Sequence, residues 1–137
     1  METNPPEGFK PLFRTSPFLD HNGPFFYREN DDGTFVVGLR IQPKHANARG
    51  IAHGGMLMTF ADAAFGQAAW DATDHADVVT LNMQSQFLAP TKEGDWLEVL
   101  PVLTRRTRSL LFLRGDFTVD GLAVFSVSSV WKILGAN

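Results

Sequence analysis

The sequence predicts an α+β fold in which one long helix is covered by an antiparallel sheet. Residues 54–71 are almost wholly apolar, and no proline occurs between Pro43 and Pro90, which is typical of a buried helix. On both sides of this segment, runs of alternating apolar and polar residues indicate five or six strands. The simplest arrangement curls the strands around the helix, although another α+β layout would also bury these apolar faces.

Composition indicates a single domain spanning residues 1–137. The net charge of −3 favours neither nucleic acid nor an anionic membrane as a partner. The absence of cysteine excludes disulfides and thiolate catalysis, and the four histidines lack the spacing of zinc ligands, so we expect no metal and no cofactor. With no N-terminal signal pattern and no apolar run of ~18 residues, we expect a cytoplasmic protein.

Residues 1–23 are rich in proline and predict an extended lead-in, with one helical turn near Phe9–Phe13 or near Ser16–Leu19. Aromatic side chains predict that this lead-in packs on the body of the protein: Phe9, Phe13 and Phe18.

Two strands precede the helix, at residues 25–29 and 34–42, and a hairpin turn at Asn30–Gly33 joins them. Residues 43–53 form a loop, and the helix then runs from about Gly54 to Asp71. The helix is apolar on nearly every side, so we expect other elements to surround it completely.

Four further strands are predicted after the helix, at residues 77–89, 95–104, 109–119 and 122–132. Asp120 and Gly121 are typical of a tight hairpin turn. Pro101 predicts a sheet edge or a bulge, because proline lacks the N–H that a strand ladder needs. Alternation in the first of the four strands places its apolar side chains on one face, Val79, Leu81, Met83 and Phe87, and its polar ones on the other, Thr80, Asn82, Gln84 and Gln86.

Asp62 lies in the middle of the predicted helix and is the only Asp, Glu, Lys or Arg between Arg49 and Asp71. A carboxylate buried in an apolar helix is costly unless it is paired. We therefore interpret Asp62 as a functional residue. The alternative is a structural carboxylate that bonds a nearby backbone group or hydroxyl.

The predicted helix begins with Gly54 and Gly55, directly after His53. The first N–H groups of a helix have no intrahelical partner and carry the positive end of its dipole. Because glycine has no Cβ, a carbonyl oxygen of a ligand could approach these donors closely. An ordinary tight turn into the helix is the alternative interpretation.

The spacing of Asn47, Gly50, His53-Gly54-Gly55 and Asp62 resembles the motif of hotdog-fold acyl-CoA thioesterases of the phenylacetic-acid-degradation type. The order of the predicted elements agrees with that family over nearly the whole chain. The resemblance implies the hotdog fold, in which a curved antiparallel sheet wraps a central helix. It also implies homodimers with joined sheets, dimers of dimers in some members, and hydrolysis of acyl-CoA.

The same resemblance implies roles for the residues of the motif. Asp62 is the candidate nucleophile, or the general base that activates water. Gly54 is the candidate oxyanion-hole donor, and Gly55 contacts the substrate beside it. Asn47 is expected to orient the thioester or the water, whereas its local chemistry fits a loop-capping residue equally well.

Two further residues receive supporting roles from the resemblance. His53 is expected to orient backbone or substrate, because the family leaves proton transfer to the carboxylate. Thr80 corresponds to a Ser or Thr that helps to position water beside that carboxylate. The alternative for Thr80 is an ordinary place on a solvated strand face.

The distance between Gly54 and Asp62 predicts a site shared by two chains. The two residues are eight positions apart, which is ~12 Å along a helix axis. A carbonyl held by the Gly54 N–H needs its attacking group within ~3–4 Å. One helix cannot provide both groups, so we expect each site of a dimer to combine Gly54 of one subunit with Asp62 of the other.

A basic turn in this acidic chain is the candidate site for the phosphates of coenzyme A. Its residues are Arg105, Arg106, Thr107, Arg108 and Ser109. The family resemblance implies that this hairpin lies near the nucleotide end of coenzyme A, and arginine suits phosphate through its forked donors. A solvated charged turn is the alternative.

Acyl-CoA hydrolysis is thus the leading functional hypothesis. A non-catalytic acyl-CoA sensor on the same fold is one alternative, although binding alone gains nothing from a buried Asp62. A structural or partner-binding α+β domain is the other alternative. The sequence has no Gly-x-Ser-x-Gly elbow and no phosphate-binding loop of the Gly-x-x-x-x-Gly-Lys type, so other common hydrolase chemistries find no support.

Overall fold

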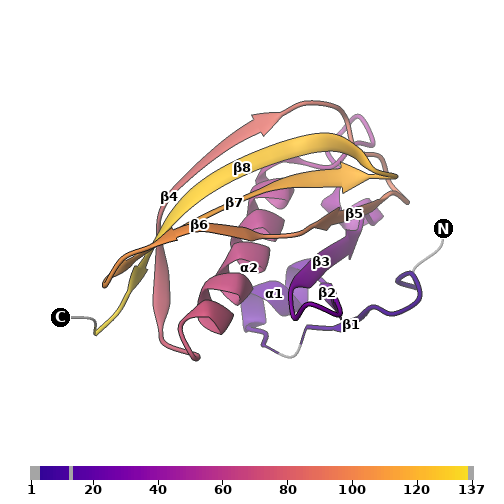
Figure 1. Cartoon of the computed structure of the whole chain (residues 1–137). Helices are drawn as coiled ribbons and strands as arrows, with labels where there is room; N and C mark the ends of the chain where they lie inside the picture. The colour runs from indigo at the N-terminus through magenta and orange to yellow at the C-terminus, as the bar shows by residue number, and fades with distance from the viewer. Residues whose placement is uncertain (1–3, 13, 136–137) are drawn as a thin grey trace.

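The computed structural model describes residues 4–12 and 14–135, and one long helix dominates it (Figure 1). The elements in chain order are β1 (Lys10–Pro11), α1 (Pro17–Asn22), β2 (Phe26–Glu29), β3 (Phe35–Arg40), the short 3₁₀ helix η1 (Pro43–His45), α2 (Gly54–Ala72), β4 (Val78–Phe87), β5 (Trp96–Val99), β6 (Val102–Arg106), β7 (Leu110–Val119) and β8 (Leu122–Ile133).

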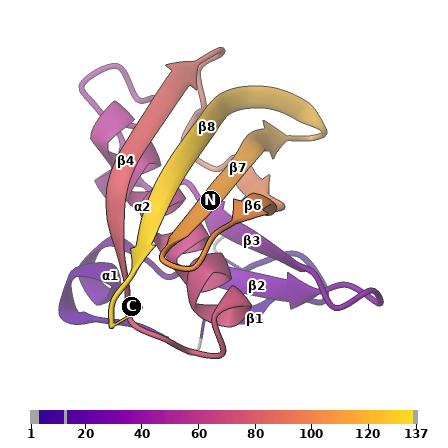
Figure 2. The same cartoon turned by 60° about the vertical axis from the view of Figure 1, so that its left-hand side comes forward.

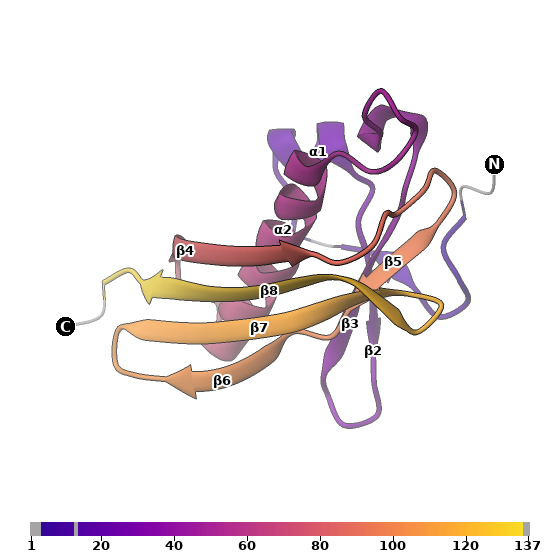
Figure 3. The ribbon, with the colours of Figure 1, turned by 90° about the horizontal axis from the view of Figure 1, so that it is seen from above.

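The strands form one antiparallel sheet that curves around α2. Their order is β1-β2-β3-β5-β7-β8-β4, and β6 pairs with β7 beside this path. Figure 2 shows α2 on the concave side of the sheet, and Figure 3 shows β4 at one edge beside β8. The predicted layout, a long helix covered by a curved antiparallel sheet, is confirmed.

Among the described residues the sheet has eight strands, so the predicted number of five or six is wrong. The predicted strand at 95–104 is interrupted at Leu100 and Pro101, which divide it into β5 and β6. Proline offers no N–H to a ladder, and β6 continues with β7 as its one partner strand among the described residues. The two-residue strand β1 adds to the number by pairing with β2.

Aromatic packing between α2 and the sheet forms the centre of the core. The rings of Phe60 and Phe65 on α2 are fully buried and contact Phe117 on β7, at centroid distances of 5.3 Å and 5.9 Å. Phe117 in turn contacts Phe125 on β8 at 5.1 Å. Burying each such side chain contributes about 1.5–3 kcal/mol, so these four rings fix the position of α2 on the sheet.

The expectation that α2 is surrounded completely is wrong within the single chain. One stripe of the helix faces outward, with Gly55 and Asp62 exposed and Gly66 half-exposed. Residues spaced in this way lie on one face of a helix, and here most of them are small. Asp62 is therefore an exposed carboxylate of the isolated chain, not a buried one.

A bulge in β4 changes which side chains face the helix. The pairing of β4 with β8 shifts between Thr80 and Asn82, so Leu81 is an extra residue. Directly opposite residues of an antiparallel pair share a face, and Thr80 lies opposite the buried Trp131. The alternation predicted for this strand is therefore wrong before the bulge. Thr80 shares the helix-facing side with Val78, Met83, Ser85 and Phe87, whereas Val79 lies opposite the exposed Lys132 on the other face.

The lead-in packs against the body through its first aromatic residue. Phe9 is 8% exposed, whereas Phe18 on α1 is 61% exposed, and Phe13 lies outside the described residues. Of the two predicted positions for a helical turn, the second is the observed one. The Ser16 hydroxyl caps α1 by accepting a hydrogen bond from the Leu19 N–H at 3.3 Å.

Candidate functional site

The first turn of α2 leaves one backbone donor free. His53 caps the helix, and its Nδ1 accepts a hydrogen bond from the Gly55 N–H at 2.9 Å. The N–H groups of Met56 and Leu57 donate to the His53 carbonyl. Within the described part of the chain, the Gly54 N–H has no hydrogen-bond partner. Gly54, rather than Gly55, therefore offers a donor to a ligand at the positive end of the helix dipole.

The loop before α2 holds Asn47 beside Gly54. The Asn47 Oδ1 accepts a hydrogen bond from the Arg49 N–H at 2.8 Å, so the side chain closes a turn. Gly50 completes this turn with φ of +78°, a conformation that suits glycine. Asn47 and Gly54 line a hollow of about 510 Å³ together with Phe87. The amide nitrogen of Asn47 remains available to a ligand there, because Asn47 uses its oxygen for the turn.

Asp62 and Thr80 meet on the outward side of α2. The Thr80 hydroxyl donates to Asp62 Oδ1 at 2.6 Å, and both residues are exposed. Such a short bond to a carboxylate is charge-assisted and fixes its orientation. The bulge at Leu81 turns Thr80 inward to make this contact. Asp62 lies in a second hollow of about 310 Å³, whose apolar walls include Leu12, Leu19, Gly66, Val78 and Trp131.

The two hollows are separate within one chain and share no lining residue. Strand β4 links them, because Thr80 near its beginning contacts Asp62 and Phe87 at its end lies against Gly54. A Cβ placed on Gly54 would lie 3.4 Å from the ring of Phe87. The candidate acid–base group and the candidate oxyanion donor thus lie near opposite ends of the edge strand.

The basic turn lies at the other end of α2 from Gly54. Arg106 Nη1 donates to the carbonyl oxygen of Ala72 at 2.6 Å, where the helix ends. A guanidinium at this position interacts favourably with the negative end of the helix dipole. Arg105 and Arg108 are exposed, and Ser109 is bound through its carbonyl by the N–H of Ile133. The structure therefore gives Arg106 a capping contact that sequence reasoning missed.

His45 is a residue that sequence reasoning missed. Its ring is 1% exposed; Nδ1 accepts from the Gln42 N–H at 3.0 Å, and Nε2–H donates to the Asn22 carbonyl at 2.6 Å. Its own carbonyl accepts the His53 N–H at 2.8 Å. Burial lowers the pKa of His45, so the ring is held neutral. His45 thus ties the cap of α2 to the end of α1.

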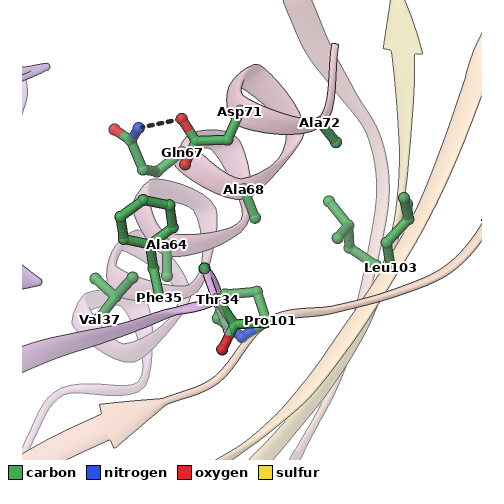
Figure 4. Close-up of a pocket in the computed structure, with 12 residues that line it drawn as sticks. Thr34, Phe35, Val37, Ala64, Gln67, Ala68, Asp71, Ala72, Pro101 and Leu103 are labelled. Carbon is green, nitrogen blue, oxygen red and sulfur yellow. Dashed lines mark hydrogen bonds between the residues drawn. The ribbon is translucent and has the colours of Figure 1, made fainter. Parts of the chain in front are cut away.

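A third hollow, of about 310 Å³, carries none of the predicted site residues. It lies between α2, the β2–β3 hairpin and β6, and Figure 4 shows its mainly apolar walls. Its polar members are Thr34, Gln67 and Asp71. A hydrogen bond of 3.2 Å joins Gln67 to Asp71, and burial raises the pKa of Asp71. Because Asp62 projects from another side of α2, this hollow is distinct from the candidate site.

Comparison with known proteins places this geometry in a family. The model of the thioesterase superfamily matches residues 49–125, which contain most of the motif and the whole of β4. A Pseudomonas aeruginosa protein whose name describes it as an esterase is 48% identical over 131 residues, covering 95% of this chain and 98% of that protein.

No helix among residues 4–12 and 14–135 is long and apolar enough to cross a membrane.

Solved structures share the fold. A mutant of the phenylacetic acid degradation protein PaaI from Thermus thermophilus superposes with a TM-score of 0.77 at 24% identity, covering 87% of this chain and all of that chain. A hypothetical thioesterase from Streptococcus pneumoniae, solved with coenzyme A, has a TM-score of 0.73 at 24% identity, covering 82% and 88% of the two chains. The fold of this chain is therefore the hotdog fold.

Proposed function

The chain belongs to the thioesterase superfamily, and from this premise we propose that it hydrolyses acyl-CoA thioesters to a free acid and coenzyme A. The observation that carries the proposal is the hydrogen bond between Asp62 and Thr80 on the outward face of α2, combined with the unpaired N–H of Gly54. A carboxylate held in one orientation and a free donor at a helix N-terminus are the two groups that acyl transfer needs.

We propose that two subunits pair through β4. This strand is a sheet edge, and it exposes apolar side chains at Val79, Leu81 and Phe87. Open edges of this kind are normally covered. Antiparallel pairing about Met83 would place Thr80 opposite Gln86 of the partner subunit. Asp62 of one chain would then lie near Gly54 of the other, and the small residues along α2 would allow a close approach.

In the proposed reaction, the Gly54 N–H binds the thioester oxygen and stabilises the negative charge that develops on it. Asp62 either removes a proton from water, which adds to the carbonyl carbon, or attacks that carbon directly to form a mixed anhydride that water then hydrolyses. The carbon–sulfur bond breaks, and the sulfur leaves as the thiolate of coenzyme A and takes up a proton. Thr80 orients Asp62, and the Asn47 amide orients the thioester or the water.

The remaining predicted residues are proposed to bind the substrate. Coenzyme A is bound in the S. pneumoniae structure, which supports a CoA ester as the substrate class. Arg105 and Arg108 are exposed and are proposed to contact its phosphates, with Ser109 beside them. The hollow beside Asp62 has both apolar and polar walls, and its apolar part around Leu12, Leu19 and Val78 is proposed to hold the acyl group.

The test is release of free thiol from a panel of short, long and aromatic acyl-CoA esters. We expect turnover by the wild-type protein and a loss of about 10²–10⁴-fold in Asp62→Asn, which keeps the shape of the side chain and its acceptor for Thr80. Asp116→Asn, an exposed carboxylate on β7, is the matched control and should retain full activity. Tight binding of acyl-CoA without thiol release would replace this proposal with the sensor function.

A further inference from the structure

Arg14 lies in the wall of the hollow beside Asp62, and its charge has no bonded partner. The exposed side chain lines this hollow, and its Cζ lies 4.8 Å from the centre of the Trp70 ring. Within residues 4–12 and 14–135, its N–H groups have no hydrogen-bond or ion-pair partner. A guanidinium presents five donors in a planar fork that matches a carboxylate. The hollow therefore contains a cation whose donors are available to a ligand.

Two carboxylates near Arg14 are bound by other residues. Asp71 accepts a hydrogen bond from Gln67 Nε2 at 3.2 Å. The charge of Arg14 acts on Asp71 without forming an ion pair, and burial, which is the larger effect, raises the pKa of Asp71. Asp20 lines a further hollow with Arg14 and accepts the Thr15 hydroxyl at 2.6 Å. Neither carboxylate occupies the guanidinium fork, so an anion from outside the chain can bind there.

The floor of the hollow is open between Asp62 and Arg14. Asp62, Gly66 and Trp70 follow one another at four-residue spacing, so they lie along one side of α2. Gly66 has no side chain, and a Cβ there would lie 3.3 Å from the ring of Trp131. Trp70, whose ring the guanidinium contacts, lies ~12 Å from Asp62 along the helix axis. Contacts of ~3 Å at each end leave ~6 Å for an acyl group.

We propose that Arg14 selects acyl groups that end in a carboxylate, so that the protein prefers coenzyme A half-thioesters of dicarboxylic acids. This inference rests on the proposed function and names its substrate class. With the thioester carbon at Asp62, the methylene chain passes the apolar residues Leu12, Leu19 and Val78, and the terminal carboxylate binds the guanidinium. At ~3.8 Å for every three bonds, a gap of ~6 Å fits a chain of about six carbons, as in adipyl-CoA.

The first test compares adipyl-CoA with hexanoyl-CoA, which has a methyl group in place of the terminal carboxylate. We expect the wild-type kcat/KM to be about 10–100-fold higher for adipyl-CoA, as charge-assisted hydrogen bonds predict. Arg14→Gln should remove this preference by lowering kcat/KM for adipyl-CoA only. Arg14→Lys keeps the charge without the fork and should restore part of the preference. Arg114→Gln, at an exposed arginine on β7, is the matched control and should keep the full preference.

The second test varies the distance between the thioester and the carboxylate, with succinyl-, adipyl- and suberyl-CoA. We expect the wild-type protein to be fastest on adipyl-CoA and Arg14→Gln to lose this optimum. Equal or faster hydrolysis of hexanoyl-CoA by the wild type would overturn the assignment. An equal defect of Arg14→Gln on adipyl- and hexanoyl-CoA, with a lower melting temperature, would also overturn it and give Arg14 a structural role.

Failure of the proposed function gives a different result from failure of this inference. If the wild-type protein hydrolyses no acyl-CoA ester, the proposed function itself fails. Hydrolysis of hexanoyl-CoA with no preference for adipyl-CoA leaves the proposed function intact and removes the role of Arg14 alone.

Discussion

The two halves of the proposed site differ in what holds them. The half around Gly54 is a backbone donor at the end of a hydrogen-bonded loop. The carbonyl of His45 accepts the His53 N–H, and the carbonyl of Thr91 accepts the Ala52 N–H, so both hold this loop in place. The half around Asp62 consists of two exposed side chains joined by one hydrogen bond of 2.6 Å. One chain alone therefore preorganises the proposed oxyanion donor, whereas the carboxylate would gain a low-dielectric environment only in the proposed dimer.

The largest effect should come from the carboxylate. Replacing Asp62 by Asn removes the negative charge and the basic group, so kcat should fall by about 10²–10⁴-fold, the range of acid–base contributions. The melting temperature should change little, because Asp62 is exposed in the single chain. Steady-state thiol release and thermal unfolding measure the two quantities. Turnover close to wild type would contradict the role of Asp62.

The role of the Gly54 N–H can be tested by a substitution that removes this backbone donor. Gly54 is the first residue of α2, where proline is tolerated, and His53 before it is extended with ψ of 135°. Gly54→Pro therefore removes the N–H and should keep the helix, and we expect kcat to fall about 10²–10³-fold. Gly54→Ala is the matched control, because it adds a side-chain carbon and keeps the donor. Equal losses in both variants would point to crowding against Phe87 instead.

Mixing the two inactive chains tests whether the halves come from different subunits. In a dimer of one Asp62→Asn chain and one Gly54→Pro chain, one site collects both defects and the other collects none. Activity per mixed dimer should therefore rise from background to about half of wild type, if the interaction between sites is small. Subunit exchange is confirmed by mass spectrometry of differently labelled chains. Exchange without rescue would show that each site is built within one chain.

A smaller effect is expected from the arginines of the basic turn. Arg105→Ala with Arg108→Ala should raise KM for acyl-CoA about tenfold and leave kcat nearly unchanged, because contacts to the phosphates act on ground state and transition state alike. The matched control uses the N-acetylcysteamine thioester, which has no phosphate and should show no change in KM. Arg106 is left intact because it caps α2. An unchanged KM for acyl-CoA would leave these side chains as solvated charges.

The smallest effect should be on the pH dependence of the melting temperature, through His45 beside the loop that leads to Gly54. Burial lowers the pKa of His45 in the folded state, so below the ordinary value of about 6.5 the unfolded chain binds a proton that the folded chain does not. Stability from His45 is therefore present above that pH and is lost as the pH falls. His45→Gln should reduce the drop in melting temperature between pH 7.5 and pH 5.5 relative to wild type. His21→Gln, an exposed control, should leave this drop unchanged.

The sequence was sufficient for the main elements because its signals are local and redundant, whereas the hotdog arrangement of those elements was predicted from the family resemblance. The apolar segment from Gly54, the turns at Asn30–Gly33 and at Asp120 with Gly121, and the long alternating strands each occur where they were predicted. The break at Pro101 was visible as a proline but not as the start of a new strand, since pairing with β7 resumes one residue later.

The site was less accessible to sequence reasoning, because it depends on register and on hydrogen bonds between distant segments. Strict alternation places Thr80 on the wrong face, and one extra residue at Leu81 corrects it. The sequence does not distinguish His45 from the other histidines, because its hydrogen bond to the Asn22 carbonyl forms only in the folded chain. Asp62 was expected to be buried because the composition of α2 shows that the helix is apolar. Composition does not show which face of the helix the single chain leaves exposed.

The order of the sheet also affects how the protein can fold while it is being synthesised. Strand β4 has β8 as its partner, and β8 is the last strand among the described residues. Helix α2 and β4 therefore emerge from the ribosome well before the residues that complete the centre of the sheet, at roughly 5–20 residues per second. Throughout that interval β4 lacks its partner strand on both edges, and an unpaired strand with apolar side chains is prone to non-specific association until β8 has been made.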